Sequence, residues 1–237
     1  MDSIAIKEIV ELARPNIIAE HGYVYSDKSL NVINEPQVKT IRLSTLKSLV
    51  ELLNKECDEF TSPIIIHVEG PCSVTVHTGV SEADRQREIP YCVSPDIPVI
   101  SFDRKMEYEN MMIGLKSKFV ETPELKELVR LLGTITEENN MQIADDGFTQ
   151  TVTVRKGIAI KGNRAVNPIV KLKPYRTFLE IDQPESEFLV RLFEGGYVAL
   201  FEADGGAWKL NARNAIQDYL SKSLSEHIES GTVIITA

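Results

Sequence analysis

Residues 64–78 carry the sequence IIIHVEGPCSVTVHT, and this stretch decides the fold. Its first five residues are mostly β-branched and predict a strand. Gly70-Pro71-Cys72-Ser73 has the chemistry of a turn, and residues 74–78 alternate between apolar and polar side chains. Two strands joined by a turn predict a hairpin, so we expect the protein to be built around a sheet.

Helices with one apolar face are predicted on both sides of this hairpin. Ser44 can cap the helix that precedes it, in which apolar residues recur at helical spacing, namely Leu46, Leu49, Val50 and Leu53. After the hairpin, Thr122 and Pro123 mark the start of a helix whose inner face holds Leu125, Leu128, Val129 and Leu132. A shorter helical pattern covers residues 5–13 and stops at Pro15.

From residue 149 the apolar pattern changes to a period of two. It predicts strands at 149–155, 158–160, 169–173, 177–181, 188–192 and 197–203. A helix containing Ile216 and Leu220 and a last strand at 232–236 follow. This order predicts the α+β class, with an N-terminal mixed α/β half and a C-terminal antiparallel sheet with a long C-terminal helix. We expect the subdomain boundary between 1–145 and 146–237.

The composition is that of an ordinary globular protein, with 26 Lys and Arg, 35 Asp and Glu, and a net charge of −9. This charge disfavours nucleic-acid or anionic-membrane binding over the whole surface. No apolar run is long enough for a membrane span, and no secretory signal is visible. Three cysteines, Cys57, Cys72 and Cys92, cannot all pair within one chain, so we expect a cytoplasmic protein with buried free thiols.

From about Val38 onward the order of elements resembles the YfdQ-type prophage proteins, a family of unknown function. The shared features are the Ser44 helix, the paired strands at 64–68 and 74–78, the Glu107-Tyr108 and Thr122-Pro123-Glu124-Leu125 helix starts, Leu172-Lys173-Pro174-Tyr175-Arg176, and the strand at Ser230-Gly231-Thr232-Val233. They span roughly four-fifths of the chain. The resemblance implies a phage-encoded protein of the host cytoplasm. It transfers no catalytic residue, and residues 204–208 have no place in it.

One pattern resembles a nuclease motif. Pro95-Asp96, followed by Asp103 and Lys105, is similar to the PD-(D/E)xK signature, in which two carboxylates hold Mg²⁺ and a lysine helps to activate water. Only six residues separate the two aspartates, which leaves little room for the hairpin that would bring them together. The alternative interpretation is a turn at Asp96 and a solvated strand end at Asp103.

A second set combines thiol and imidazole groups. Its members are Cys57, His67, Cys72, His77 and Cys92. Zinc sites use such ligands, but typically with a close pair two to four residues apart, which this set lacks. We therefore expect no metal and no cofactor.

The most unusual feature is a basic segment with seven cations and no acid between residues 155 and 176. The cations are Arg155, Lys156, Lys161, Arg164, Lys171, Lys173 and Arg176. Such a ladder, with Tyr175 among the cations, can follow a phosphate backbone and stack bases. Alternatively the cations occupy the solvent face of a sheet, or complement the acidic segment 182–204 within or between subunits.

Two carboxylates, Glu202 and Asp204, stand two residues apart at a predicted strand end, before Gly205-Gly206. Such a pair can bind a cation or perform acid–base chemistry, or Asp204 can simply open a glycine turn. Trp208 is expected to anchor the helix that follows.

These patterns favour a phage-encoded, non-catalytic accessory protein that acts by protein binding or self-assembly, as a homo-oligomer or on a host factor. The seven cations are its candidate binding residues. A metal-dependent nuclease that uses Asp96, Asp103 and Lys105 is one alternative. A single-strand nucleic-acid binder that uses segment 155–176 is the other.

Overall fold

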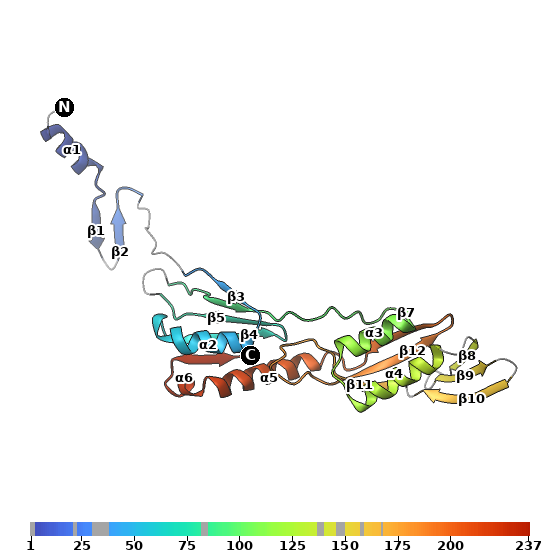
Figure 1. The fold of residues 1–237 in the computed structure, drawn as a ribbon. Coiled ribbons are helices and arrows are strands. Elements are labelled where there is room, and N and C mark those ends of the chain that lie inside the picture. Colours follow the sequence, from blue (N-terminus) through green and yellow to red (C-terminus); the bar gives the residue numbers. More distant parts are fainter. Residues whose placement is uncertain are drawn as a thin grey trace. The chain divides into compact units, whose positions relative to one another are not determined.

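The computed structural model describes residues 3–20, 23–29, 38–81, 85–136, 140–145, 150–156, 159–166 and 168–237 (Figure 1). The described residues form helices, one mixed sheet and further antiparallel sheets, with an antiparallel sheet and the helix α5 (Trp208–Ser223) in the C-terminal part. The predicted α+β class is therefore confirmed. The chain falls into two compact units, residues 1–37 and 38–237.

The first unit consists of one helix and one hairpin. These are α1 (Ser3–Ala13), β1 (Ile17–Glu20) and β2 (Tyr23–Ser26), with the two strands antiparallel. The Asp27 carboxylate accepts hydrogen bonds from the backbone nitrogen of Asn16 at 2.8 Å and from its Nδ2 at 2.9 Å. The Lys28 ammonium donates to the Arg14 carbonyl at 2.9 Å and also to the Leu12 carbonyl. Polar contacts therefore connect the hairpin to the end of α1.

A five-stranded mixed sheet begins the second unit. Its order is β14 (Val233–Thr236), β4 (Ile64–Gly70), β5 (Ser73–His77), β6 (Tyr91–Val93) and β3 (Ile41–Leu43). The strands β4 and β5 form the predicted hairpin, in which Ile66 pairs with Val76. The two outer pairs, β14 with β4 and β3 with β6, are parallel. The last strand of the chain thus lies beside the first strand of the hairpin.

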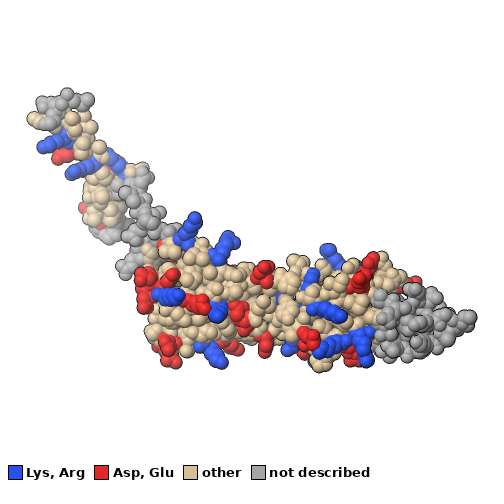
Figure 2. All heavy atoms as spheres, viewed as in Figure 1, with Lys and Arg blue, Asp and Glu red and all other residues tan. Residues whose placement is uncertain are grey.

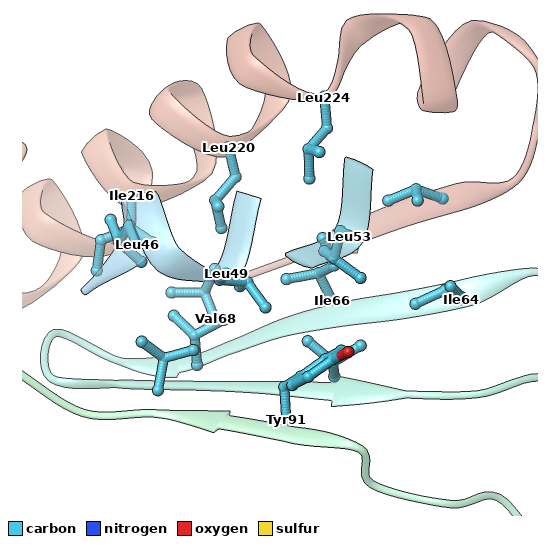
Figure 3. Close-up of a cluster of buried hydrophobic side chains, with 14 of the residues drawn as sticks. Leu46, Leu49, Leu53, Ile64, Ile66, Val68, Tyr91, Ile216, Leu220 and Leu224 are labelled. Atoms are coloured by element: carbon cyan, nitrogen blue, oxygen red, sulfur yellow. The ribbon is translucent and has the colours of Figure 1, made fainter. Parts of the chain in front are cut away.

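The helices α2 (Leu46–Glu56) and α5 (Trp208–Ser223) pack on this sheet, and their apolar side chains meet those of β4 in one buried core (Figure 3). The cap of α2 is Thr45, not the predicted Ser44. The backbone of Thr45 is extended, and its hydroxyl accepts a 3.1 Å hydrogen bond from the Ser48 amide. A short helical turn, η1 (Cys57–Glu59), follows α2, and α6 (Ser225–Glu229) follows α5.

A second core lies between an antiparallel sheet and two further helices. The sheet order is β11 (Ile169–Leu172), β12 (Ser186–Phe193), β13 (Tyr197–Glu202) and β7 (Met106–Glu107). The helices are α3 (Tyr108–Lys118) and α4 (Pro123–Thr136). The Leu125 amide donates to the Thr122 hydroxyl at 3.1 Å, which confirms the predicted cap of α4. The core contains Met111, Leu128 and Phe188.

A separate three-stranded antiparallel sheet carries part of the basic segment. Its order is β10 (Ala159–Val166), β9 (Gln150–Lys156) and β8 (Asn140–Asp145). The side chains of residues 134–167 lie outside the described part of the chain. Residues on both sides of position 145 build each of the two buried cores. The division into 1–145 and 146–237 differs from the two compact units and stays a prediction.

The strand predicted at residues 177–181 is wrong. This segment forms turns between β11 and β12. The backbone nitrogens of Arg176 and Thr177 donate to the side-chain oxygen of Gln183, at 3.0 and 3.3 Å, instead of to a neighbouring strand. The Gln183 side chain in turn donates to the carbonyl of Phe178 at 2.9 Å. A side-chain amide therefore replaces the ladder partner that the alternating pattern suggested.

Candidate functional site

The turn segment between β11 and β12 places a charged side chain in the interior. Arg176 is only 6% exposed, whereas free arginine side chains normally reach solvent. Besides the Gln183 contact, its carbonyl accepts a hydrogen bond from the thiol of Cys72 at 3.1 Å. The neighbouring Thr177 hydroxyl donates to the Pro71 carbonyl at 2.5 Å. The segment is thereby attached to the turn of the β4–β5 hairpin.

Two acids at the end of β13 balance the buried guanidinium. Its Nη1 donates to Glu202 Oε1 at 2.6 Å, and its Nη2 donates to the hydroxyl of Ser186. That hydroxyl donates to Asp204 Oδ2 at 2.5 Å. The carboxylate pair that the sequence singled out therefore lies against this chain's own arginine. Such charge-assisted hydrogen bonds are the strong ones in proteins.

An aromatic ring completes the arrangement, which we call the Arg176 cluster: Arg176, Ser186, Glu202, Asp204 and Trp208. The guanidinium carbon lies 3.9 Å from the centroid of the Trp208 ring, a cation–π distance. Trp208 is the first residue of α5, where we expected it to anchor the helix. In addition, its ring stacks on the guanidinium of Arg176. In the described part of the chain, Nε of Arg176 and Nε1 of Trp208 are buried without a hydrogen-bond partner.

The electrostatics of the cluster favour a fixed ion pair. Burial lowers the pKa of Arg176, and the charges of Glu202 and Asp204 oppose that effect. Burial acts to raise the pKa of Asp204, but hydrogen bonds from the Ser186 hydroxyl and the Gly206 amide, with the Arg176 charge, bring it below its usual value. The Ser186 hydroxyl is engaged by both a donor and an acceptor. The hydroxyl thus joins Arg176 to Asp204. The cluster is therefore suited to holding together the segments that carry these residues.

The three nuclease candidates lie in the segment between β6 and β7 and at its end. Asp96 is exposed, and the backbone nitrogen of Asp103 donates to the Leu200 carbonyl at 2.8 Å. The Lys105 ammonium lies 4.0 Å from the centroid of the Phe193 ring. Among the described residues, no three His, Cys, Asp or Glu side chains form a group that could hold a metal ion. The described residues therefore offer no further metal ligand beside Asp96 and Asp103, and the nuclease hypothesis stays a prediction.

The five thiol and imidazole candidates have different surroundings. Cys57 is buried in the first core, whereas Cys72 and Cys92 are half-buried, so the expectation of buried thiols holds for one of the three. Burial raises the pKa of Cys57 and of Cys72, which disfavours the reactive thiolate. His67 Nδ1 shares a 2.9 Å hydrogen bond with the Thr236 hydroxyl, and His77 Nε2 shares one of 3.2 Å with that of Thr75.

The basic segment is divided between two environments. Arg155, Lys156, Lys161 and Arg164 lie on β9 and β10, where the side chains are outside the described residues. Of the other three cations, Lys171 lies 4.0 Å from the Glu187 carboxylate, Lys173 is half-buried, and Arg176 belongs to the cluster. Arg176 is thus engaged internally and is not presented to a phosphate backbone.

Sequence reasoning missed a surface at the amino end, which we call the N-terminal apolar surface. Its members are exposed side chains of α1, β1 and β2, namely Ile4, Ile6, Ile9, Val10, Leu12, Ile17, Ile18, Val24 and Tyr25. Leu12 is 78% exposed and Val24 is 69% exposed. None of the residues in this unit whose burial the structure describes is buried. The helical pattern at 5–13 predicted an apolar face, but it did not predict that these side chains are exposed.

Within the described ranges, the structure contains no helix that is long and apolar enough to cross a membrane. No family model, curated protein or solved structure matches this chain. The resemblance to the YfdQ-type prophage proteins therefore stays a prediction from the sequence.

Proposed function

We propose that this protein is a non-catalytic binding protein that associates with further copies of itself through the N-terminal apolar surface. The observation that carries the proposal is the exposure of nine large apolar side chains on a unit of one helix and one hairpin. Soluble monomers rarely expose large contiguous apolar patches, and those that are exposed usually mark interaction sites.

The size of this unit supports the same proposal. An isolated helix shorter than about 12–15 residues is marginal in water, and so is an isolated two-stranded hairpin. The helix α1 has 11 residues, and each strand of the hairpin has four. Burying each Ile, Leu or Val side chain contributes roughly 1.5–3 kcal/mol. Association would supply the burial that the unit lacks within its own residues.

The charges of the unit favour a second copy as the partner. Residues 3–29 contain three cations, Lys7, Arg14 and Lys28, and four acids, Glu8, Glu11, Glu20 and Asp27. The whole unit, residues 1–37, also contains Asp2 and Glu35, so it holds three cations and six acids, a net charge of −3. The charged side chains of one copy can therefore pair with those of opposite sign on a second copy.

Sedimentation velocity of the full chain tests this function. The unmodified protein should associate in a concentration-dependent way, and the double substitution Ile9→Gln with Val10→Gln should shift it to the monomer. The matched control is Val99→Gln with Leu210→Gln, which changes two exposed apolar residues, 82% and 62% exposed, in the second unit. The control should associate like the unmodified protein. A monomer at all concentrations, or an unchanged Ile9/Val10 variant, would refute the proposal.

A further inference from the structure

A groove lies where the carboxyl end of α3 meets the first half of α4. Its volume is about 380 Å³, within the range of roughly 300–1,000 Å³ typical of ligand sites. Its apolar lining consists of Phe119, which follows α3, and of Leu125 and Val129 of α4. Phe119 and Leu125 are part of the second core, with exposures of 5% and 4%. The floor of the groove is therefore an extension of that core and is held in place by it.

Cations surround this apolar floor. Lys116 of α3 and Lys126 and Arg130 of α4 line the groove, with Glu121 as the one acid among the lining residues. Glu121 forms an ion pair with Lys126, and both side chains are largely exposed. Figure 2 shows Lys and Arg side chains beside Asp and Glu side chains over this part of the molecule. The groove thus offers an apolar floor and a positive rim on an acidic protein, which suits an apolar segment that carries acids.

We propose that the groove receives α1 of a second copy of this chain. The helix α1 exposes Ile9 and Leu12 on its apolar side. Glu8 precedes Leu12 by four residues, and Glu11 follows Glu8 by three, so both acids lie along one edge of this side. An amphipathic helix that lays its apolar face into a groove is a common mode of recognition. Acids beside that face would meet the cations of the rim.

This inference rests on the proposed self-association and names the surface that accepts the N-terminal unit. The contact is between two different patches, a helix face and a groove, and it predicts a defined charge pattern. Reversing the charges on either side should weaken association, and reversing both sides should restore it. A contact between two α1 helices would not respond to the groove charges in this way.

A charge-swap experiment on the full chain tests the groove by sedimentation velocity. Lys116→Glu with Lys126→Glu, and separately Glu8→Lys with Glu11→Lys, should each weaken self-association about tenfold, equivalent to 1.4 kcal/mol. An equal mixture of the two variants should regain the association of the unmodified protein, because every helix then finds a groove of opposite charge. The control, Lys47→Glu with Lys222→Glu, reverses exposed lysines on α2 and α5 and should change nothing.

The outcomes separate this inference from the proposed function. If the groove variant associates normally while the Ile9/Val10 variant dissociates, self-association stands and the groove is not its receptor. The inference also fails if the mixture is as weak as its components, or if the control weakens association equally. If the Ile9/Val10 variant associates normally, both the function and the groove assignment fail. Urea unfolding of each variant verifies that the folded state is retained.

Discussion

The guanidinium carbon of Arg176 lies 3.9 Å from the centroid of the Trp208 ring, and this contact joins two parts of the second unit. Trp208 begins α5, which packs in the core of the five-stranded sheet. Arg176 is bonded to Ser186 and Glu202, which belong to the strands of the other core. The Arg176 cluster therefore links the two cores by polar contacts.

Removing the buried cation should destabilise the fold strongly. Arg176→Met removes the hydrogen bonds of the buried guanidinium to Glu202 and Ser186, and losing a hydrogen bond to a charged group costs about 1.5–3 kcal/mol. The matched control is Lys171→Met, because Lys171 pairs with Glu187 at 4.0 Å and both side chains are half exposed. Loss of this exposed ion pair should lower the free energy of unfolding by less than about 1 kcal/mol. Urea unfolding curves measure both, and equal effects would contradict a structural role for the cluster.

The cluster also predicts how stability depends on pH. The pKa of Asp204 is lowered in the folded protein, although burial acts to raise it, because the Ser186 and Gly206 hydrogen bonds and the Arg176 charge favour the carboxylate. At acidic pH the unfolded chain therefore binds more protons at this residue than the folded one. The stabilisation is complete above the ordinary aspartate pKa and is lost as the pH falls through the lowered value.

Asp204→Asn tests this pH dependence. We expect the variant to lose less stability than the unmodified protein as the pH falls below the ordinary aspartate pKa, where the unfolded chain of the unmodified protein takes up a proton at Asp204 before the folded one does. Urea unfolding at several acidic pH values measures the slope. Asp218→Asn, which changes an exposed aspartate of α5, should keep the slope of the unmodified protein. A parallel slope for the Asp204 variant would show that the carboxylate is not stabilised in the fold.

Local patterns predicted the elements that depend on neighbouring residues. The hairpin at 64–78 and the cap at Thr122 follow from propensities and spacings within a few positions, and both are present. The cap of α2 was displaced by one residue because Ser44 and Thr45 are both competent caps, and only the backbone conformation selects Thr45. Single-sequence patterns carry no information on that choice.

The long-range contacts could not be predicted in the same way. The sequence offered pairing of the basic segment with the acidic segment 182–204 as one alternative, but it did not indicate that Arg176 meets Glu202 and Asp204 in the interior. Their meeting depends on how β12 and β13 pair and on the Gln183 turn, which brings residues 26 and 28 positions apart together. The 78% exposure of Leu12 likewise depends on which residues pack against its helix, and periodicity does not encode that.

A separate polar contact on the five-stranded sheet should respond to substitution of one hydroxyl. Hydrogen bonds from Ser73, at 2.7 Å, and from Thr75, at 3.0 Å, lower the pKa of Glu69 against the effect of burial, and Ser73 is the largest cause. Ser73→Ala should therefore raise this pKa more than Thr75→Ala does. Carboxyl-detected NMR titration measures each value. A larger increase in the Thr75 variant would contradict this order.

Gly79 is expected to tolerate no side chain. A Cβ atom there would lie 2.7 Å from the carbonyl oxygens of both Thr61 and Ser62, too close for a nonbonded contact with backbone atoms. The Gly79 amide also donates to the Thr61 carbonyl at 2.5 Å, so the two segments cannot separate without losing a hydrogen bond. Gly79→Ala should lower the free energy of unfolding by about 1–3 kcal/mol, as overpacking typically does.

The matched control is Gly70→Ala, because a Cβ atom at Gly70 would meet nothing within 4 Å. Gly70 is a strand residue of the same sheet, at the end of β4, and its substitution should leave the free energy of unfolding within about 0.5 kcal/mol of the unmodified value. Urea unfolding monitored by far-ultraviolet circular dichroism compares the two variants under one condition. If both alanines have the same effect, the close approach of residues 61–62 to Gly79 does not determine the packing at this edge of the first core.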